Sequence, residues 1–230
     1  MPTPRTSRRC ASAQKLSSHS SARLALLGRR GGARDGGATA AARAVKVAVA
    51  ALSLFDDGDT AAILPAVELI GSLADGAPAA ADAAAERALA CLECTALGAV
   101  LRAMDVQPSN ARLHGPCCRA LAALSAPSPA VEARCARLVA DGAPARLAAS
   151  LDAHARATPD LARWAVLAHR HLTSTNDAIA PLARKQAALD AGAARALCAA
   201  MLLHARDVPL QLDGSAALRQ FSRRAATHWR

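Results

Sequence analysis

The chain repeats one pattern, which its last copy shows most clearly: Ala191-Gly-Ala-Ala-Arg-Ala-Leu-Cys-Ala-Ala-Met-Leu-Leu-His204. Two further copies share its glycine and the apolar stripe that follows: Leu97-Gly-Ala-Val-Leu-Arg-Ala-Met-Asp-Val106 and Asp141-Gly-Ala-Pro-Ala-Arg-Leu-Ala-Ala-Ser-Leu-Asp-Ala-His154. The equivalent residues Met104, Leu151 and Met201 lie 47 and 50 residues apart. Helical units that recur at about this period are typical of α-solenoids of the HEAT or armadillo kind. The repeat therefore predicts an all-α chain of stacked helical units.

Each unit divides into three helices at residues that typically begin or end helices. Thr158-Pro159-Asp160 begins a helix with an N-cap residue, a proline at the first helical position and an acid in the first turn. Ser128-Pro129 begins another helix in the same way. Gly98, Gly142 and Gly192 each separate a short first helix from a second helix, because glycine readily adopts the positive φ of a sharp turn.

Alanine dominates the composition. The 230 residues include 64 alanines and no tyrosine, and only 2% of them are aromatic. Alanine has the highest intrinsic helix propensity, whereas sandwiches and barrels need β-branched and aromatic residues. The composition therefore supports the all-α prediction. It also excludes any catalytic mechanism in which a tyrosine acts as the acid. The lack of aromatic residues argues against a surface on which successive nucleic-acid bases stack.

Two copies of a first helix and its turn carry a family resemblance. They read Ala133-Arg-Cys-Ala-Arg-Leu-Val-Ala-Asp-Gly-Ala143 and Arg184-Lys-Gln-Ala-Ala-Leu-Asp-Ala-Gly-Ala193. Both resemble the corresponding segment of armadillo repeats. The resemblance implies an armadillo-type superhelix of about three full three-helix repeats after a partial repeat, together forming one domain over residues 40–230. The expected boundaries are 40–76 for the partial repeat, 81–126, 128–174 and 181–223 for the full repeats, and 224–230 for a C-terminal tail.

Positive charge is concentrated near the N-terminus. The net charge is +10, and residues 1–43 hold nine basic residues against Asp35 alone. We expect residues 1–39 to form a disordered basic leader rich in Arg, Ser and Gly, either an ordinary tail or a transit peptide. The expected location is intracellular, in the cytoplasm, or in a mitochondrion or chloroplast if the leader is a transit peptide. Seven cysteines, an odd number, fit a reducing compartment.

The resemblance also implies a binding surface. Armadillo proteins bind extended peptides or protein surfaces in a concave groove made by their third helices. Peptide-binding members hold the ligand backbone with asparagines, whose positions read Ser72, Ala123, His171 and Gln220 here, so an importin-like peptide ladder is not expected. The expected groove residues would suit an acidic or mixed protein surface: Arg119, His169, Arg170, His171, Arg219 and Gln220. The alternative interpretation of these residues is a solvated helix face.

Motifs for catalysis or metal binding are lacking in the sequence. It contains no GxSxG, HExxH or GxxxxGKS/T pattern, and we expect no enzyme activity, metal or cofactor. Four cysteines, with His114 nearby, are nominal zinc ligands: Cys91, Cys94, Cys117 and Cys118. We favour the alternative that these cysteines act as small hydrophobic residues in apolar helices.

These observations predict a non-enzymatic protein–protein interaction module. The alternative is an organellar RNA-binding α-solenoid, which the basic leader favours. The net charge of only +2 over residues 44–230, and the lack of base-reading side chains repeated in each unit, count against nucleic acid. No apolar run is long enough for membrane insertion. An uncovered end of the repeat array would allow self-association.

Overall fold

The structure, a computed structural model, describes residues 47–50, 52, 60–74, 96–127, 131–174 and 180–225. All secondary structure in these ranges is helical, which confirms the all-α prediction. The helices are, in chain order, α3 (Thr60–Ala74), α5 (Ala96–Val106), α6 (Ala111–Leu124), α7 (Val131–Ala140), α8 (Ala143–His154), α9 (Pro159–Thr173), α10 (Ala180–Asp190), α11 (Ala193–Leu203) and α12 (Val208–Ala225). The expected leader 1–39, the pair Cys91 and Cys94, and residues 226–230 of the expected tail lie outside the described residues.

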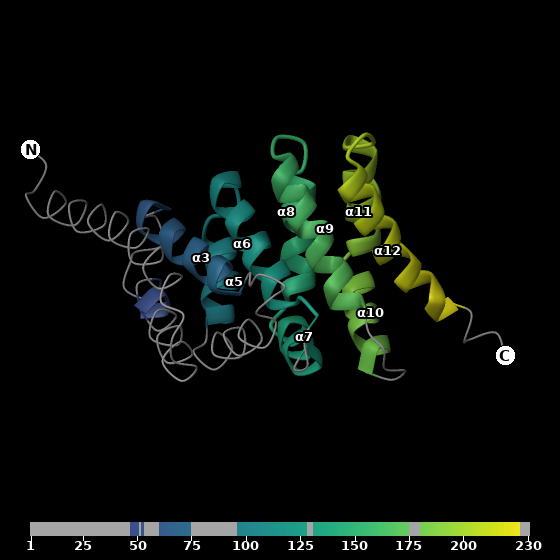
Figure 1. The fold of residues 1–230 in the computed structure, drawn as a ribbon, viewed down its shortest axis with the longest axis horizontal. Coiled ribbons are helices and arrows are strands. Elements are labelled where there is room, and N and C mark those ends of the chain that lie inside the picture. The colour runs from purple at the N-terminus through teal and green to yellow at the C-terminus, as the bar shows by residue number, and fades with distance from the viewer. Residues whose placement is uncertain are drawn as a thin grey trace, which may run out of the picture.

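The described helices form rows along the molecule. α3, α6, α9 and α12 pack side by side in that order, and we call them the third-helix row. α5, α8 and α11 form a second row beside it. α7 and α10 contact each other, and each also packs against the two helices that follow it in its own unit. Figure 1 shows the resulting succession of units along the long axis of the molecule, from α3 to α12.

Local sequence explains where the helices turn and begin. Gly142 and Gly192 have φ values of +82° and +78°, so each forms the left-handed turn that separates α7 from α8 and α10 from α11. The break predicted at Gly98 is wrong, because this residue lies inside α5: glycine permits a turn but does not impose one, and the neighbouring alanines and leucines favour a helix. Pro159 is the first residue of α9, where its fixed φ suits a helix and its missing N–H costs no hydrogen bond. Thr158 precedes it at the N-cap position, but its side chain makes no capping hydrogen bond.

Leucine and alanine fill the core. The buried cluster extends from the N-terminal helices to Phe221 in α12. Its large, fully buried side chains are mostly leucines: Leu113, Leu121, Leu124, Leu138, Leu147, Leu161, Leu172, Leu197 and Leu210. Buried alanines lie between them and let neighbouring helices approach closely, so that a chain with few aromatic residues still closes its core.

Polar contacts join each unit to the one before it. His154, at the end of α8, donates its Nε2 proton to the carbonyl oxygen of Pro108 at 2.8 Å. His204, directly after α11, donates in the same way to the carbonyl oxygen of Ala155, also at 2.8 Å. The two histidines are 50 residues apart, so the contacts between units repeat together with the helices.

Two buried arginines occupy equivalent positions in α7 and α10. Arg134 donates from Nε to the carbonyl oxygen of Leu124 at 2.8 Å and from Nη2 to that of Ala126 at 2.9 Å. These bonds satisfy carbonyl groups that the end of α6 leaves without a helical partner. Arg184, the counterpart in α10, pairs through Nη2 with Glu132 of α7 at 2.7 Å. The buried arginines of the first helices thus link α7 to the end of α6 and α10 to α7.

Candidate functional site

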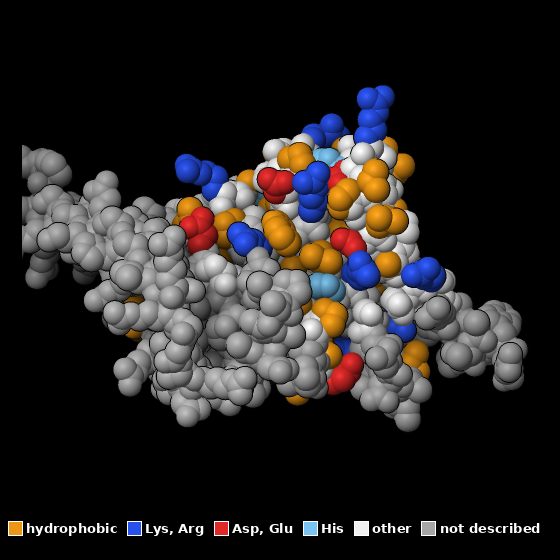
Figure 2. All heavy atoms as spheres, viewed as in Figure 1, with side chains coloured by type: hydrophobic (Ala, Val, Ile, Leu, Met, Phe, Trp, Pro, Cys, Tyr) orange, Lys and Arg blue, Asp and Glu red, His pale blue; other side chains and the backbone are white. Residues whose placement is uncertain are grey.

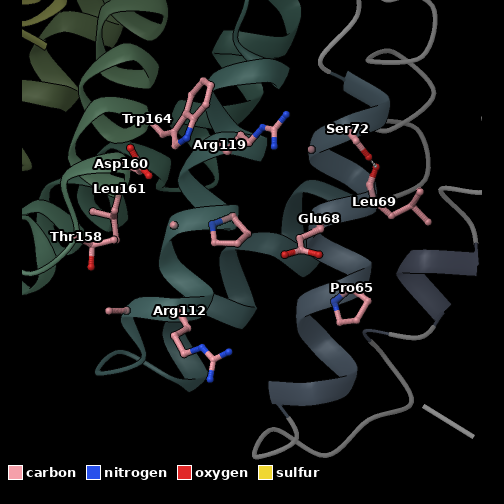
Figure 3. A pocket seen from close by; sticks show the side chains of 14 residues that line it. Pro65, Glu68, Leu69, Ser72, Arg112, Arg119, Thr158, Asp160, Leu161 and Trp164 are labelled. Carbon is pink, nitrogen blue, oxygen red and sulfur yellow. Dashed lines mark hydrogen bonds between the residues drawn. The ribbon is translucent and has the colours of Figure 1, made fainter. Parts of the chain in front are cut away.

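A groove crosses the third-helix row where α3, α6 and α9 adjoin. It has a volume of about 550 Å³. Its lining combines apolar and charged residues from all three helices: Pro65, Glu68, Leu69, Gly71, Ser72, Ala111, Arg112, Gly115, Pro116, Arg119, Thr158, Asp160, Leu161 and Trp164. Figure 3 shows the α3 residues on one side, the α9 residues on the other and α6 between them. We call this hollow the α3/α6/α9 groove.

Small residues on α6 keep the groove open. Ala111 and Gly115 line it, and they are four residues apart, so they lie one turn apart on the same face of the helix. A Cβ atom at Gly115 would meet no atom within 4 Å. A larger side chain at this position would therefore enter the groove without displacing the core.

Four charged residues line the groove. Arg112 and Arg119 come from α6 and lie two helical turns apart, whereas Glu68 comes from α3 and Asp160 from α9 (Figure 3). All four are exposed. Their charges balance, so the groove combines both signs and has no net charge of its own. Such a lining suits a partner that also carries charges of both signs.

An aromatic ring of α9 packs against an arginine of α6. The guanidinium carbon of Arg119 lies 5.5 Å from the centroid of the Trp164 ring, within the range of a cation–π interaction. Trp164 is only half-buried, so part of the indole remains accessible at the groove. Figure 3 shows both side chains at the same end of the groove. Tryptophan and arginine are among the side chains that contribute most to the free energy of protein–protein binding.

The structure separates the residues that the sequence assigns to one binding surface. Arg119 lines the α3/α6/α9 groove, but the others do not. Arg170 is exposed on α9 and forms an ion pair with Asp213 of α12. Arg219 is exposed and Gln220 is half-buried, both on α12. These α12 residues belong to the third-helix row but lie outside the groove.

The assignment of His169 to the surface is wrong. Its side chain is fully buried, and neither ring nitrogen has a hydrogen-bond partner among the described residues. Burial lowers the pKa of His169 to about 4, so the imidazole is neutral at pH 7 and attracts no acidic partner. The reason is helical periodicity, because His169 lies three residues from both Val166 and Leu172 on the buried face of α9. His171 is half-buried, and its Nδ1 donates to the carbonyl oxygen of Ala122 at 3.0 Å.

Sequence reasoning missed four charged or aromatic groove residues, namely Glu68, Arg112, Asp160 and Trp164. Arg112 precedes Arg119 by seven residues, and Trp164 precedes His171 by seven. Seven residues are about two helical turns, so each pair lies on one face of its helix. That spacing is the signal that could have placed Arg112 and Trp164 on the groove side.

Three of the four described cysteines are buried and are not poised for nucleophilic chemistry, whereas Cys198 is exposed. Burial raises the pKa of the Cys118 thiol to about 12 and that of Cys135 to about 11, so both are protonated at neutral pH. Cys117 is also fully buried, and burial raises its pKa well above the usual value. Among the described residues, no group of three or more His, Cys, Asp or Glu side chains could hold a metal ion.

No single helix within the described ranges is both long and apolar enough to cross a membrane. The bent pair Leu182–Asp190 and Ala193–Leu203 meets the criteria of length and composition only when its two parts are counted together. In the structure, α10 and α11 pack against other helices of the array.

No family model, curated protein or solved structure matches the chain. The chemistry of the groove is therefore the guide to its ligand. Apolar walls, an accessible indole ring and charges of both signs extend over three helices. This mixture resembles the anatomy of protein–protein interfaces, where aromatic and arginine side chains are enriched and the rim is polar.

Proposed function

We propose that the chain is a non-enzymatic protein–protein interaction module, an armadillo-type α-solenoid that binds a protein partner through its third-helix row. The succession of three-helix units supports the solenoid assignment, because each unit buries its apolar stripe against its neighbours. The equivalent contacts of His154 and His204, one repeat apart, support it as well. The burial and protonation of Cys117 and Cys118 argue against a nucleophilic role for these two thiols.

The observation that carries the binding proposal is the α3/α6/α9 groove. It lies on the third helices, where the resemblance to armadillo repeats places the partner. The groove is built on packed helices, so little conformational entropy is lost when a partner binds. Burying the accessible indole of Trp164 supplies apolar contact, while Arg119 beside it supplies a charge for orientation.

The charges of the groove define the partner it suits. Acidic groups of the partner would pair with Arg112 and Arg119 on α6, and basic groups with Glu68 and Asp160 on the two walls. The partner is therefore a protein segment with mixed charge and at least one apolar side chain for Trp164. Fixed charges of both signs favour specificity and a single binding register.

A groove-filling substitution tests this proposal. Gly115→Trp places an indole in the groove, because a Cβ at this position meets nothing within 4 Å. Gly98→Trp on α5 is the matched control: its Cβ also meets nothing within 4 Å, and it is exposed outside the groove. Tagged full-length wild type and both variants would be used for affinity purification from the source cells, at low and high salt, with and without nuclease. Co-purifying proteins and RNA are both quantified.

We expect one or more discrete proteins that wild type and Gly98→Trp retain at high salt and that Gly115→Trp loses by about tenfold or more. Retention of the same proteins by Gly115→Trp would contradict binding in the groove. RNA that is enriched at low salt and lost at high salt would support the RNA-binding alternative instead, because contacts to phosphates weaken steeply with salt.

A further inference from the structure

Exposed apolar side chains gather at the end of the array formed by α11 and α12. Leu202 is 81% exposed, Leu212 66%, Val208 64% and Leu203 43%. The four residues lie at the end of α11 and the beginning of α12, and we call them the C-terminal end face. Figure 2 shows hydrophobic side chains collected over these two helices. Exposed apolar patches of this kind usually mark an interaction site.

Comparison with the preceding unit shows what this face lacks. In α8, Asp152 accepts hydrogen bonds from Nη1 and Nη2 of Arg195 in α11, at 3.0 and 2.6 Å. Counted from the repeated glycines Gly142 and Gly192, the position of Asp152 is occupied by Leu202 in the last unit. A leucine thus replaces the carboxylate that forms the ion pair between the preceding unit and its neighbour.

The third helices show the same replacement. Arg163 of α9 pairs with Asp207, directly before α12, at 2.5 Å. Aligned on the buried leucines that begin each helix, Leu161 and Leu210, the position of Arg163 is occupied by Leu212. A neighbour built like the unit of α10, α11 and α12 would therefore meet leucines where that unit itself finds Asp152 and Arg163. The face does not suit another unit of this kind.

The C-terminal end face does not suit contact with water either, because four large apolar side chains are exposed together there.

We propose that the C-terminal end face pairs with the same face of a second copy of this chain around a two-fold axis. A two-fold axis places an identical patch opposite each patch, so leucines meet leucines and no charged partner is required. The four side chains are between 43% and 81% exposed and form the centre of the contact, whereas a standard interface buries about 800 Å² on each partner. Small exposed neighbours such as Ala199 and Ala205 extend the contact.

The charges near the face give the dimer a distinctive salt dependence. Arg206 lies in the turn between α11 and α12, and Arg219 lies two helical turns after Leu212. Both are exposed, so in the dimer the arginines of the two copies repel each other. Salt screens this repulsion, so the dimer should become tighter as salt rises. A contact held by ion pairs would weaken instead.

Sedimentation velocity of the full chain and of charge variants tests the proposal. Leu202→Asp with Leu212→Asp gives an acidic face, and Leu202→Arg with Leu212→Arg gives a basic face; both positions are exposed, so the fold is retained, which circular dichroism verifies. Val47→Asp is the matched control, because Val47 is 60% exposed in another part of the chain. Each protein is measured alone from about 1 to 100 µM at two salt concentrations, and the acidic and basic variants are also mixed.

We expect wild type and Val47→Asp to dimerise, more tightly at higher salt. The acidic and basic variants should each be monomeric alone and should form a heterodimer when mixed, because opposite charges then meet across the two-fold axis. Cys198, exposed on α11 one turn before Leu202, should cross-link wild-type dimers through a short bismaleimide, and Cys198→Ser should lose that product.

Three results would overturn the proposal. The first is a wild-type chain that stays monomeric at about 100 µM. The second is a dimer that survives both charge variants, since another surface would then hold it. The third is a dimer that is lost when residues 1–46 are deleted from the chain, since the N-terminal segment would then be what binds the face.

Discussion

Replacing His169 with leucine should stabilise the chain at neutral pH and weaken its sensitivity to acid. The imidazole is fully buried, and its two nitrogens have no hydrogen-bond partner among the described residues. Leaving a buried polar group unsatisfied costs about 1–3 kcal/mol. Leucine has nearly the same size and no polar atoms. We therefore expect His169→Leu to raise the free energy of unfolding at pH 7 by about 1–3 kcal/mol.

The effect of acid follows from the pKa of the same side chain. Burial lowers the pKa of His169 from 6.5 to about 4, so the unfolded chain takes up a proton near pH 6.5 and the folded chain only near pH 4. This residue therefore leaves stability unchanged above about pH 6.5 and reduces it as the pH falls from about 6.5 to about 4. At 1.36 kcal/mol per pKa unit, the free energy of unfolding falls by about 3 kcal/mol because of this residue. Burial also lowers the pKa of His114 and His171, and their contribution remains in the variant.

Urea unfolding followed by circular dichroism at about pH 7 and about pH 4 measures both effects. His204→Leu is the control, because His204 donates a hydrogen bond to Ala155 at 2.8 Å, and losing it should destabilise the chain by about 1 kcal/mol. The reasoning is refuted if His169→Leu is less stable than wild type at pH 7 and loses as much stability as wild type on acidification.

Three further substitutions test the packing of the units by chemical or thermal denaturation. Leu197→Asp buries an unpaired charge in the core and should cost more than about 4 kcal/mol, so a cooperative transition at the wild-type midpoint would contradict the repeat assignment. Arg134→Met removes the hydrogen bonds to the carbonyl groups at the end of α6 and should lower the free energy of unfolding by about 3 kcal/mol. The control Arg137→Met changes an exposed arginine and should cost about 0.5 kcal/mol or less. Equal effects of the two substitutions would be inconsistent with the buried contact. Gly192→Ala forces alanine to a φ of +78° and should cost about 1 kcal/mol, whereas Gly98→Ala, in helix α5, should stabilise slightly; a gain at both positions would argue against the left-handed turn.

Sequence features that act locally predicted the helices well. Gly142 and Gly192 lie at turns with positive φ, which glycine adopts without strain, and Pro159 begins α9, because proline fixes φ near the helical value. Gly98, where the same turn is predicted, instead lies inside α5. The expected N-cap at Thr158 is correct in position, although its side chain makes no capping hydrogen bond. Rules based on single residues therefore predict the position of a helix end better than they predict the rotamer of the side chain at the N-cap.

The candidate groove could not be predicted in the same way. It depends on helices that are far apart in the sequence, such as α3 and α9, and on a missing side chain at Gly115. The contact of Arg119 with Trp164 joins two units and follows from the packing of α6 against α9. His169 shows the converse error, because a polar residue near a predicted surface lies on the buried face of its helix. Helical periodicity within α9 identifies this face, but residue type alone does not.

Footprinting of a partner complex shows whether the partner binds in the α3/α6/α9 groove. The full chain is oxidised by hydroxyl radicals alone and with the protein that it captures, and the oxidation of each residue is measured by mass spectrometry. We expect the half-buried indole of Trp164 and the half-buried Leu69 on the opposite wall to be protected in the complex, because both line the α3/α6/α9 groove. Unchanged oxidation of Trp164, with protection confined to α5, α8 or α11, would contradict binding through the third-helix row.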